Sequence, residues 1–169
     1  MNLACHCSEA EPRKLFLPMT DVVSAQVRSR MMAGIRGMDT KPELFLRKGL
    51  HARGFRFRLH VRNLPGRPDL VFKSRRAVIF AHGCFWHGHD CQLFKWPRTR
   101  PEWWRAKILR NRENDKRAET SLLDTGWRCG IVWECALKGT ERLSADEVLK
   151  RCEQWLYSSR QAIEIRGQR

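Results

Sequence analysis

Apolar and polar residues follow two different periods along this chain, which together predict a mixed α/β fold. Residues 55–60 alternate between apolar and basic side chains, a pattern typical of a half-buried strand with a basic outer face. Residues 77–81 are continuously apolar, as in a central strand covered on both faces. A basic turn at 73–76 joins this run to residues 70–72, which predicts a hairpin, and residues 127–133 predict a further strand.

Three helices are predicted, each from a capping signal at its start. Thr40 and Glu43 have the form of a capping box, which gives Glu43 a structural task, a bond back to the cap. Thr99 and residues 143–148 provide the other two signals. The predicted helices cover about residues 41–52, 101–124 and 145–156.

The long predicted helix carries one inward face. Helical spacing places Ile108, Asn111, Asp115, Ala118 and Leu122 on it. A buried carboxylate needs a partner, so Asp115 is expected to pair either with an imidazolium or with a nearby arginine.

The length of 169 residues fits one domain, whose predicted extent is 21–157. Residues 1–20 and 158–169 lack the periodicity of a regular element and are predicted to be a flexible extension and a flexible tail. Residues 21–38 carry arginines among methionines, and two interpretations stay open. They form a basic arm that pushes a methionine between DNA bases, or a short helix whose methionines fill the core.

The charge balance points to a polyanionic partner. There are 33 Lys and Arg against 18 Asp and Glu, a formal net charge of +15. Such a surface favours nucleic acid, with a merely soluble basic protein as the alternative. The sequence shows no signal-peptide pattern and no apolar run of about 20 residues, so we expect a cytoplasmic protein that does not enter a membrane.

Residues 82–91 combine two cysteines, three histidines, an aspartate and two large aromatics, a mixture that indicates a site. Cys84, His89 and Cys91 are ligand types that a tetrahedral zinc prefers, and a closed site needs a fourth. Cys135, which follows the strand at 127–133, is the expected fourth ligand. His87 is then left with its imidazole available for catalysis.

Asp69 stands at the start of the short apolar run 70–72. A carboxylate there is either a turn residue or the magnesium ligand of a metal-dependent nuclease. Because residues 70–72 and 77–81 are expected to form a hairpin, Asp69 and the 82–91 segment are predicted to lie within reach of one another.

Four motifs follow one another along the chain: PGRPDL at 65–70, VIFAHGCFWH at 78–87, KILRNREND at 107–115 and GWRCGIVWECAL at 126–137. In this order they resemble the very short patch repair DNA mismatch endonucleases, and the resemblance runs from about Ser29 to Trp155. It implies a restriction-endonuclease-like fold, with a central mixed β-sheet flanked by helices and a structural zinc site. It also implies an enzyme that nicks one DNA strand beside a thymine mispaired with guanine.

The resemblance also implies roles for individual residues. Asp69 resembles the family's Mg²⁺ ligand, and Ala81 resembles a position that helps to hold Mg²⁺, usually threonine. Alanine can replace threonine there if the contact is made by the main-chain carbonyl, but not if it is made by the hydroxyl. The remaining expected active-site residues are Glu43, His82, His87 and Asp115. The expected zinc ligands are Cys84, His89, Cys91 and Cys135. The expected DNA-contacting residues are Phe85, Trp86, Trp104 and Met32.

The implied reaction is Mg²⁺-assisted hydrolysis of a phosphodiester, in which His87 exchanges the proton and Asp115 fixes its tautomer. No Glu-x-Lys motif follows on the second strand, and a histidine stands in place of the lysine. The expected partner is double-stranded DNA with a T·G mismatch, bound by a monomer that cooperates with other mismatch-repair proteins. Two alternatives stay open: a zinc-stabilised DNA-binding module that cuts nothing, and a less selective DNA nuclease.

Overall fold

The computed structural model of the chain describes residues 24, 26–27, 30 and 37–168. The chain divides into two units, Met1–Ile35 and Arg36–Arg169. In the first unit, the Val27 N–H donates to the Ser24 hydroxyl over 3.3 Å. The expected extension at 1–20 and Met32 lie outside the described residues. The second unit carries the features described below.

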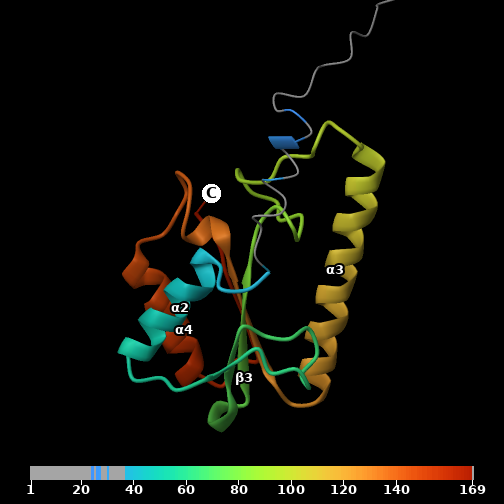
Figure 1. Cartoon of the computed structure of the whole chain (residues 1–169). Coiled ribbons are helices and arrows are strands. Elements are labelled where there is room, and N and C mark those ends of the chain that lie inside the picture. The colour runs from blue at the N-terminus through green and yellow to red at the C-terminus, as the bar shows by residue number, and fades with distance from the viewer. Residues whose placement is uncertain (1–23, 25, 28–29, 31–36, 169) are drawn as a thin grey trace, which may run out of the picture. The chain divides into compact units, whose positions relative to one another are not determined.

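The second unit is built on one mixed sheet of five strands with three helices around it (Figure 1). The strands are β1 (Arg58–Leu59), β2 (Leu70–Phe72), β3 (Ala77–His82), β4 (Arg128–Trp133) and β5 (Ala162–Ile165). The helices are α2 (Lys41–Ala52), α3 (Pro101–Asp124) and α4 (Ala145–Tyr157), with short 3-10 turns at Lys73–Arg75 and Glu134–Ala136. The strands lie in sequence order; β1, β2 and β3 are antiparallel neighbours, and β3, β4 and β5 are parallel. The predicted α/β class is therefore confirmed.

Helices cover both faces of this sheet, with α2 and α4 on one face and α3 on the other (Figure 1). Successive strand residues point to opposite faces, so β2 contributes to two cores. Leu70 packs with Leu46 of α2 in the larger core. Val71 packs with Leu122 of α3 in the smaller one. β3 lies between β2 and β4, as its continuous apolar run predicts.

Two of the three capping signals act as predicted. The Thr40 hydroxyl accepts the Glu43 N–H and the Glu43 carboxylate returns a bond to the cap, while Ser144 accepts the Glu147 N–H at 3.1 Å. The signal at Thr99 was wrong, because α3 begins after Arg100, which makes no side-chain cap. Arg100 has a φ of 51°, and this left-handed turn removes Thr99 from the cap position.

Two other expectations differ from the structure. The strand expected at residues 55–60 is reduced to β1, because the backbone turns at His60, whose φ is 47°. The tail expected at 158–169 instead contains β5, which pairs in parallel with β4. Its residues, Ala-Ile-Glu-Ile, alternate as in a strand whose apolar side chains face the core, a short signal that the sequence analysis did not single out. The strand pairs with the edge that β4 presents. Among the described helices, none is long and apolar enough to cross a membrane.

Candidate active site and metal centre

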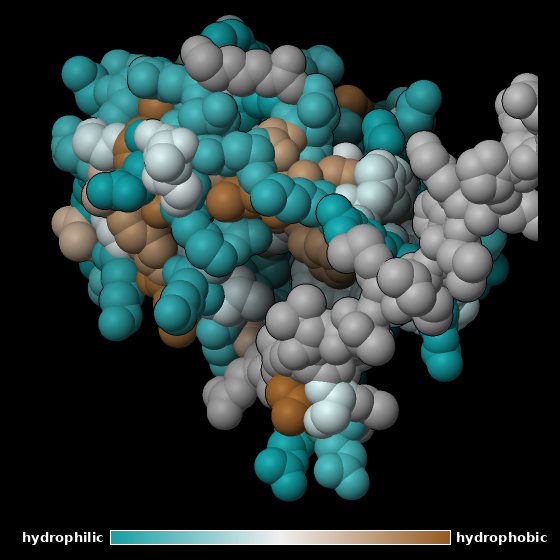
Figure 2. All heavy atoms as spheres, turned by 90° about the horizontal axis from the view of Figure 1, so that it is seen from above, coloured by the Kyte–Doolittle hydropathy of each residue, from teal (hydrophilic) through white to brown (hydrophobic). Residues whose placement is uncertain are grey.

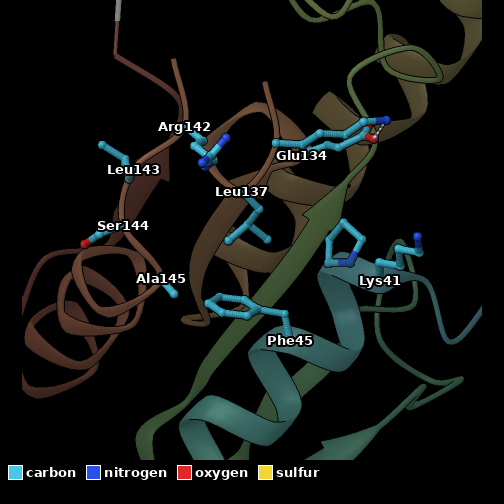
Figure 3. Close-up of a pocket in the computed structure, with 10 residues that line it drawn as sticks. Lys41, Phe45, Glu134, Leu137, Arg142, Leu143, Ser144 and Ala145 are labelled. Carbon is cyan, nitrogen blue, oxygen red and sulfur yellow. Dashed lines mark hydrogen bonds and ion pairs between the residues drawn. The ribbon is translucent and has the colours of Figure 1, made fainter. Parts of the chain in front are cut away.

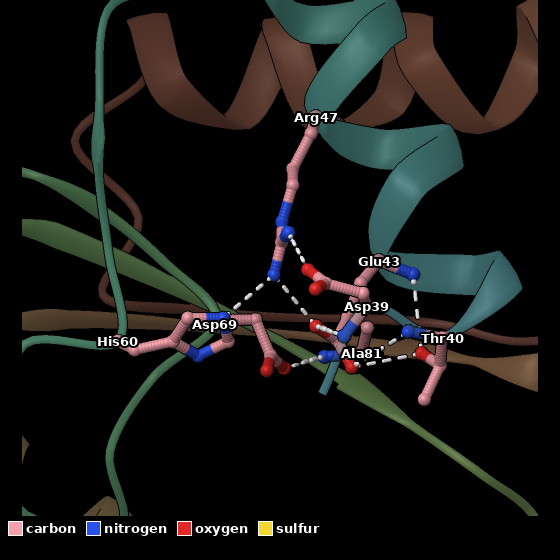
Figure 4. Close-up of polar contacts among 7 residues, drawn as sticks. All are labelled: Asp39, Thr40, Glu43, Arg47, His60, Asp69 and Ala81. Carbon is pink, nitrogen blue, oxygen red and sulfur yellow. Dashed lines mark hydrogen bonds and ion pairs between the residues drawn. The ribbon is translucent and has the colours of Figure 1, made fainter. Parts of the chain in front are cut away.

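Asp69 is fixed at the end of the hairpin that β2 and β3 form. Its Oδ2 accepts the main-chain N–H of Ala81 at 2.7 Å (Figure 4). The N–H and C=O of one strand residue point to the same side, so the Ala81 carbonyl also faces this edge. The carboxylate and the carbonyl expected to hold Mg²⁺ therefore lie beside one another.

The surroundings of Asp69 make its charge costly. Burial raises the pKa of Asp69 from 3.8 to about 6, although the hydrogen bond from Ala81 opposes the rise. The negative charge of Glu43 raises this pKa further, whereas His60 and Arg47 lower it. A half-buried carboxylate that resists ionisation gains stability from a cation, which is the fit expected of a metal ligand.

Glu43 is buried at the first turn of α2, with 3% of the residue exposed. Its Oε1 accepts the Thr40 hydroxyl at 2.8 Å and the Thr40 N–H at 3.4 Å. Its Oε2 accepts the Asp39 N–H at 3.1 Å and Arg47 Nη2 at 2.7 Å (Figure 4). Both carboxylate oxygens of Glu43 therefore accept hydrogen bonds. The same carboxylate caps α2 and lies near Asp69.

Three residues that the sequence analysis did not single out complete this network. Arg47 contacts the carboxylates of Asp39 and Glu43, and its Nη2 lies 2.8 Å from His60 Nε2 (Figure 4). The i,i+4 spacing of Glu43 and Arg47 on a predicted helix is a signal that identifies this pair. No local signal places His60 there, because alternation along 55–60 assigns it to the outer face.

A second cluster combines two histidines with Asp115 of α3. His87 Nδ1 lies 2.5 Å from Asp115 Oδ2, and the His82 and His87 rings stack with centroids 3.9 Å apart. Of the two expected partners of Asp115, the structure shows the imidazole. Asn111 of the same helix face donates to the Trp86 carbonyl at 2.8 Å, which holds the loop against α3.

His82 differs from His87 in its surroundings. Burial lowers the pKa of His82 from 6.5 to about 3, and the nearby His87 lowers it further. Its Nδ1 is buried without a hydrogen-bond partner among the described residues. His82 is therefore neutral near pH 7 and packs against the ring that Asp115 orients.

The four expected zinc ligands lie together, with their ligand atoms within 4.8 Å of one another; they are Cys84, His89, Cys91 and Cys135. The sulfurs of Cys84 and Cys135 each lie 3.5 Å from His89 Nδ1, which identifies Nδ1 as the inward nitrogen. Backbone N–H groups of Cys135 and Gly167 donate to the Cys84 and Cys135 sulfurs. Burial raises the pKa of both thiols above 9.0. Three sulfurs and one imidazole around a buried point are a donor set that suits tetrahedral zinc.

The aromatic residues expected to contact DNA form one cluster. Phe85 makes edge contacts with Trp86 and Trp104 at centroid distances of 5.2 and 5.1 Å. Trp103 packs edge-on against Trp104 and is 54% exposed. Among the described residues, the loop after β3 and the first turn of α3 therefore share an aromatic surface.

A separate pocket of about 620 Å³ lies between the start of α2 and the segment leading into α4 (Figure 3). Phe45, Leu137 and Leu143 provide its apolar lining, and Lys41 and Arg142 stand at its border. Asp69 and His87 do not line it.

The face seen in Figure 2 is mostly hydrophilic, with hydrophobic patches between, in keeping with a net charge of +15.

The chain is similar in sequence to several known DNA endonucleases. The family model for "DNA mismatch endonuclease Vsr" matches residues 20–93. The chain is 47% identical over 127 residues to the type II nicking enzyme V.XorIIP of Xanthomonas oryzae pv. oryzae, covering 75% of this chain and 93% of that protein. It is 47% identical over 138 residues to the DNA mismatch endonuclease Vsr of Escherichia coli, covering 82% and 88%. A type II nicking enzyme of Neisseria meningitidis serogroup A, V.NmeAIP, is 41% identical over 120 residues, covering 71% and 86%.

Proposed function

The chain belongs to the Vsr family of DNA mismatch endonucleases, and from this membership we propose that it nicks one strand of duplex DNA at a T·G mismatch in a Mg²⁺-dependent reaction. It is a strand-nicking DNA endonuclease of very short patch repair. The observation that carries the catalytic part is the hydrogen bond between His87 Nδ1 and Asp115 Oδ2. A module that only binds DNA has no need of an imidazole oriented in this way. The expected setting is the bacterial cytoplasm.

Asp69 and the Ala81 carbonyl would hold Mg²⁺. The fit is supported by the raised pKa of Asp69 and by the hydrogen bond that fixes its Oδ2. The contact at position 81 uses the main chain, so alanine serves as well as a residue with a hydroxyl. When bound, Mg²⁺ supplies charge neutralisation at the scissile phosphate and orients water there.

His87 is the residue proposed to exchange a proton. A carboxylate only accepts hydrogen bonds, so the neutral ring keeps its proton on Nδ1, facing Asp115, and carries its lone pair on Nε2. His82 stacks on this ring and stays neutral, which limits the directions in which His87 can turn. The proton therefore enters and leaves at Nε2.

The proposed zinc site is structural. The ion would be held by Cys84, His89 Nδ1, Cys91 and Cys135. Four protein ligands complete a tetrahedral zinc site, so no position would remain for water or substrate. When bound, zinc supplies folding free energy. It would join the loop after β3, which carries His87, to the turn after β4.

The proposed mismatch contact is the aromatic surface of Phe85, Trp86 and Trp104. A mispaired step costs less to unstack than a paired one, so aromatic side chains can separate it selectively. Lysine and arginine side chains would supply affinity through the phosphates without sequence information. The monomeric state and the cooperation with other repair proteins stay predictions.

The test compares wild type with Asp69→Asn on a T·G duplex in Mg²⁺, measuring binding and nicking separately. Asp124→Asn is the matched control, because Asp124 is an exposed carboxylate at the end of α3. We expect the Asp69 variant to bind DNA within about twofold of wild type and to lose nicking, while the control nicks normally. Binding without nicking by the wild type itself would support the DNA-binding module instead.

A further inference from the structure

Arg47 is a largely buried arginine beside the proposed metal site. Only 11% of its side chain is exposed, although the chain carries 33 Lys and Arg. Its guanidinium contacts Asp39, Glu43 and His60 at once (Figure 4). Its Nε–H is buried without a partner among the described residues. Removing an arginine from water is costly unless every donor is satisfied, so stability alone is a poor reason for this placement.

The backbone around Arg47 is also shaped to hold it. His60 adopts a φ of 47°, a left-handed conformation that is unfavourable for a residue with a side chain. This turn directs the His60 ring to Arg47, whereas a continued strand would have left it on the outer face. Asp39, at a φ of 59°, holds the guanidinium from the opposite side. Two uncommon backbone conformations therefore converge on one guanidinium.

The charges explain what this guanidinium does. The negative charge of Glu43 raises the pKa of Asp69, and the positive charge of Arg47 opposes this effect. Arg47 also occupies Glu43 Oε2, so Glu43 cannot turn toward a cation without breaking that bond. The second strand of this chain has no Glu-x-Lys motif, and Arg47 is a permanent cation in the same neighbourhood.

Resting on the proposed nuclease function, we propose that Arg47 is a positioning residue that fixes the orientation of Glu43 and confines the catalytic divalent cation to Asp69. Asp39 and His60 hold Arg47 in place. With Arg47 present, the carboxylates of Glu43 and Asp69 and the guanidinium have a net charge of −1. Without it, the same carboxylates reach −2 and Glu43 Oε2 keeps only the bond from the Asp39 N–H, which leaves this oxygen freer to bind the cation directly. The cation is then held more tightly in a less productive site.

The test uses Arg47→Met and Arg47→Lys, with Arg53→Met as the matched control. Arg53 caps the same helix and is also held by two carboxylates, Asp146 and Glu153, each at 2.5 Å. The control therefore removes an ion-paired arginine from α2 without touching the proposed site. Two quantities are measured on zinc-loaded protein below its melting temperature. They are Mn²⁺ affinity, by electron paramagnetic resonance, and kcat for nicking as a function of Mg²⁺.

For Arg47→Met we expect Mn²⁺ to bind about tenfold more tightly and kcat to fall about tenfold, because one charge near a divalent ion is removed. Arg47→Lys keeps the charge but loses the two-pronged hydrogen bonding. It is expected to restore the Mn²⁺ affinity while kcat stays low. In a Glu43→Gln background, the Arg47→Met change is expected to have little further effect on kcat, since Arg47 acts through Glu43.

Equal Mn²⁺ affinity and equal kcat in Arg47→Met and Arg53→Met would overturn the proposal while leaving the nuclease function intact. If Arg47→Met does not fold, Arg47→Lys decides, and an unchanged kcat in that variant overturns the proposal. If wild type nicks no duplex, the proposed function fails, and the Mn²⁺ measurement still tests how Arg47 controls cation binding.

Discussion

Asp69 is predicted to destabilise the metal-free protein at neutral pH, and Asp69→Asn is predicted to remove that cost. The pKa of Asp69 rises from 3.8 to about 6 on folding, mainly through burial. The folded chain therefore holds this proton more tightly than the unfolded chain does. Stability is lost as pH rises from about 4, and the loss is complete above about 6.

The magnitude follows from the same shift. Roughly 2 pH units at about 1.4 kcal/mol each give about 3 kcal/mol as an upper value. An asparagine keeps an oxygen for the Ala81 N–H but carries no charge. We therefore expect Asp69→Asn to be more stable than wild type at pH 7 by up to about 3 kcal/mol. For a chain of this size, that corresponds to roughly 6–12 °C in Tm.

The assay is thermal and urea denaturation of both proteins between pH 4 and pH 8, without Mg²⁺ and without chelator, so that zinc stays bound. The difference between the two proteins is expected to be small near pH 4 and to grow up to about pH 6. Added Mg²⁺ should stabilise wild type and leave the variant unchanged. A variant that is no more stable at pH 7, or a difference that does not shrink toward pH 4, would refute the reasoning.

Four other substitutions test three separate parts of the site. His87→Ala is expected to lower kcat by about 10²–10⁴-fold and to retain DNA binding. Asp115→Asn is expected to lower kcat less and also to retain binding. If DNA binding weakens as much as kcat falls, the role of His87 in proton exchange is contradicted. Cys84→Ser is expected to lose zinc and to have a lower Tm, measured by elemental analysis and calorimetry. The control Cys152→Ser, in the core, is expected to keep its zinc. Equal zinc content in the two variants would count against the four-ligand site. Trp104→Ala is expected to weaken binding to a T·G duplex by about 1–3 kcal/mol in a fluorescence titration, and an equal loss on a matched duplex would oppose a mismatch contact.

Local sequence patterns correctly predicted helix starts, the central strand and several site residues. The capping box at Thr40 predicted where α2 begins, and the apolar run at 77–81 predicted β3. Cys135 was expected as the fourth ligand of the proposed zinc site because a strand ends just before it, and its sulfur lies 3.5 Å from His89 Nδ1. Helical spacing predicted that Asp115 lies on the inward face of its helix, and the structure shows that its partner is His87.

The features that the sequence did not predict depend on contacts between residues far apart in the chain. β5 is a four-residue segment, too short for its alternation to stand out within a basic tail, and it pairs with the edge that β4 offers. His60 alternates correctly with its neighbours, but a left-handed turn reverses its direction toward Arg47. The closeness of Asp69 to the segment after β3 was predicted from the hairpin and is confirmed, but the bond between Ala81 and Asp69 depends on the hairpin register, which the pattern did not predict. No periodicity encodes such pairings.

Mismatch-directed nicking is tested by mapping the cleavage position at single-nucleotide resolution. Wild type would be incubated with Mg²⁺ and two end-labelled duplexes that differ only in one T·G mismatch. We expect a single nick in the strand that carries the mispaired thymine, at that thymine, and none in the matched duplex. Equal cutting of both duplexes, or cutting of both strands, would contradict it.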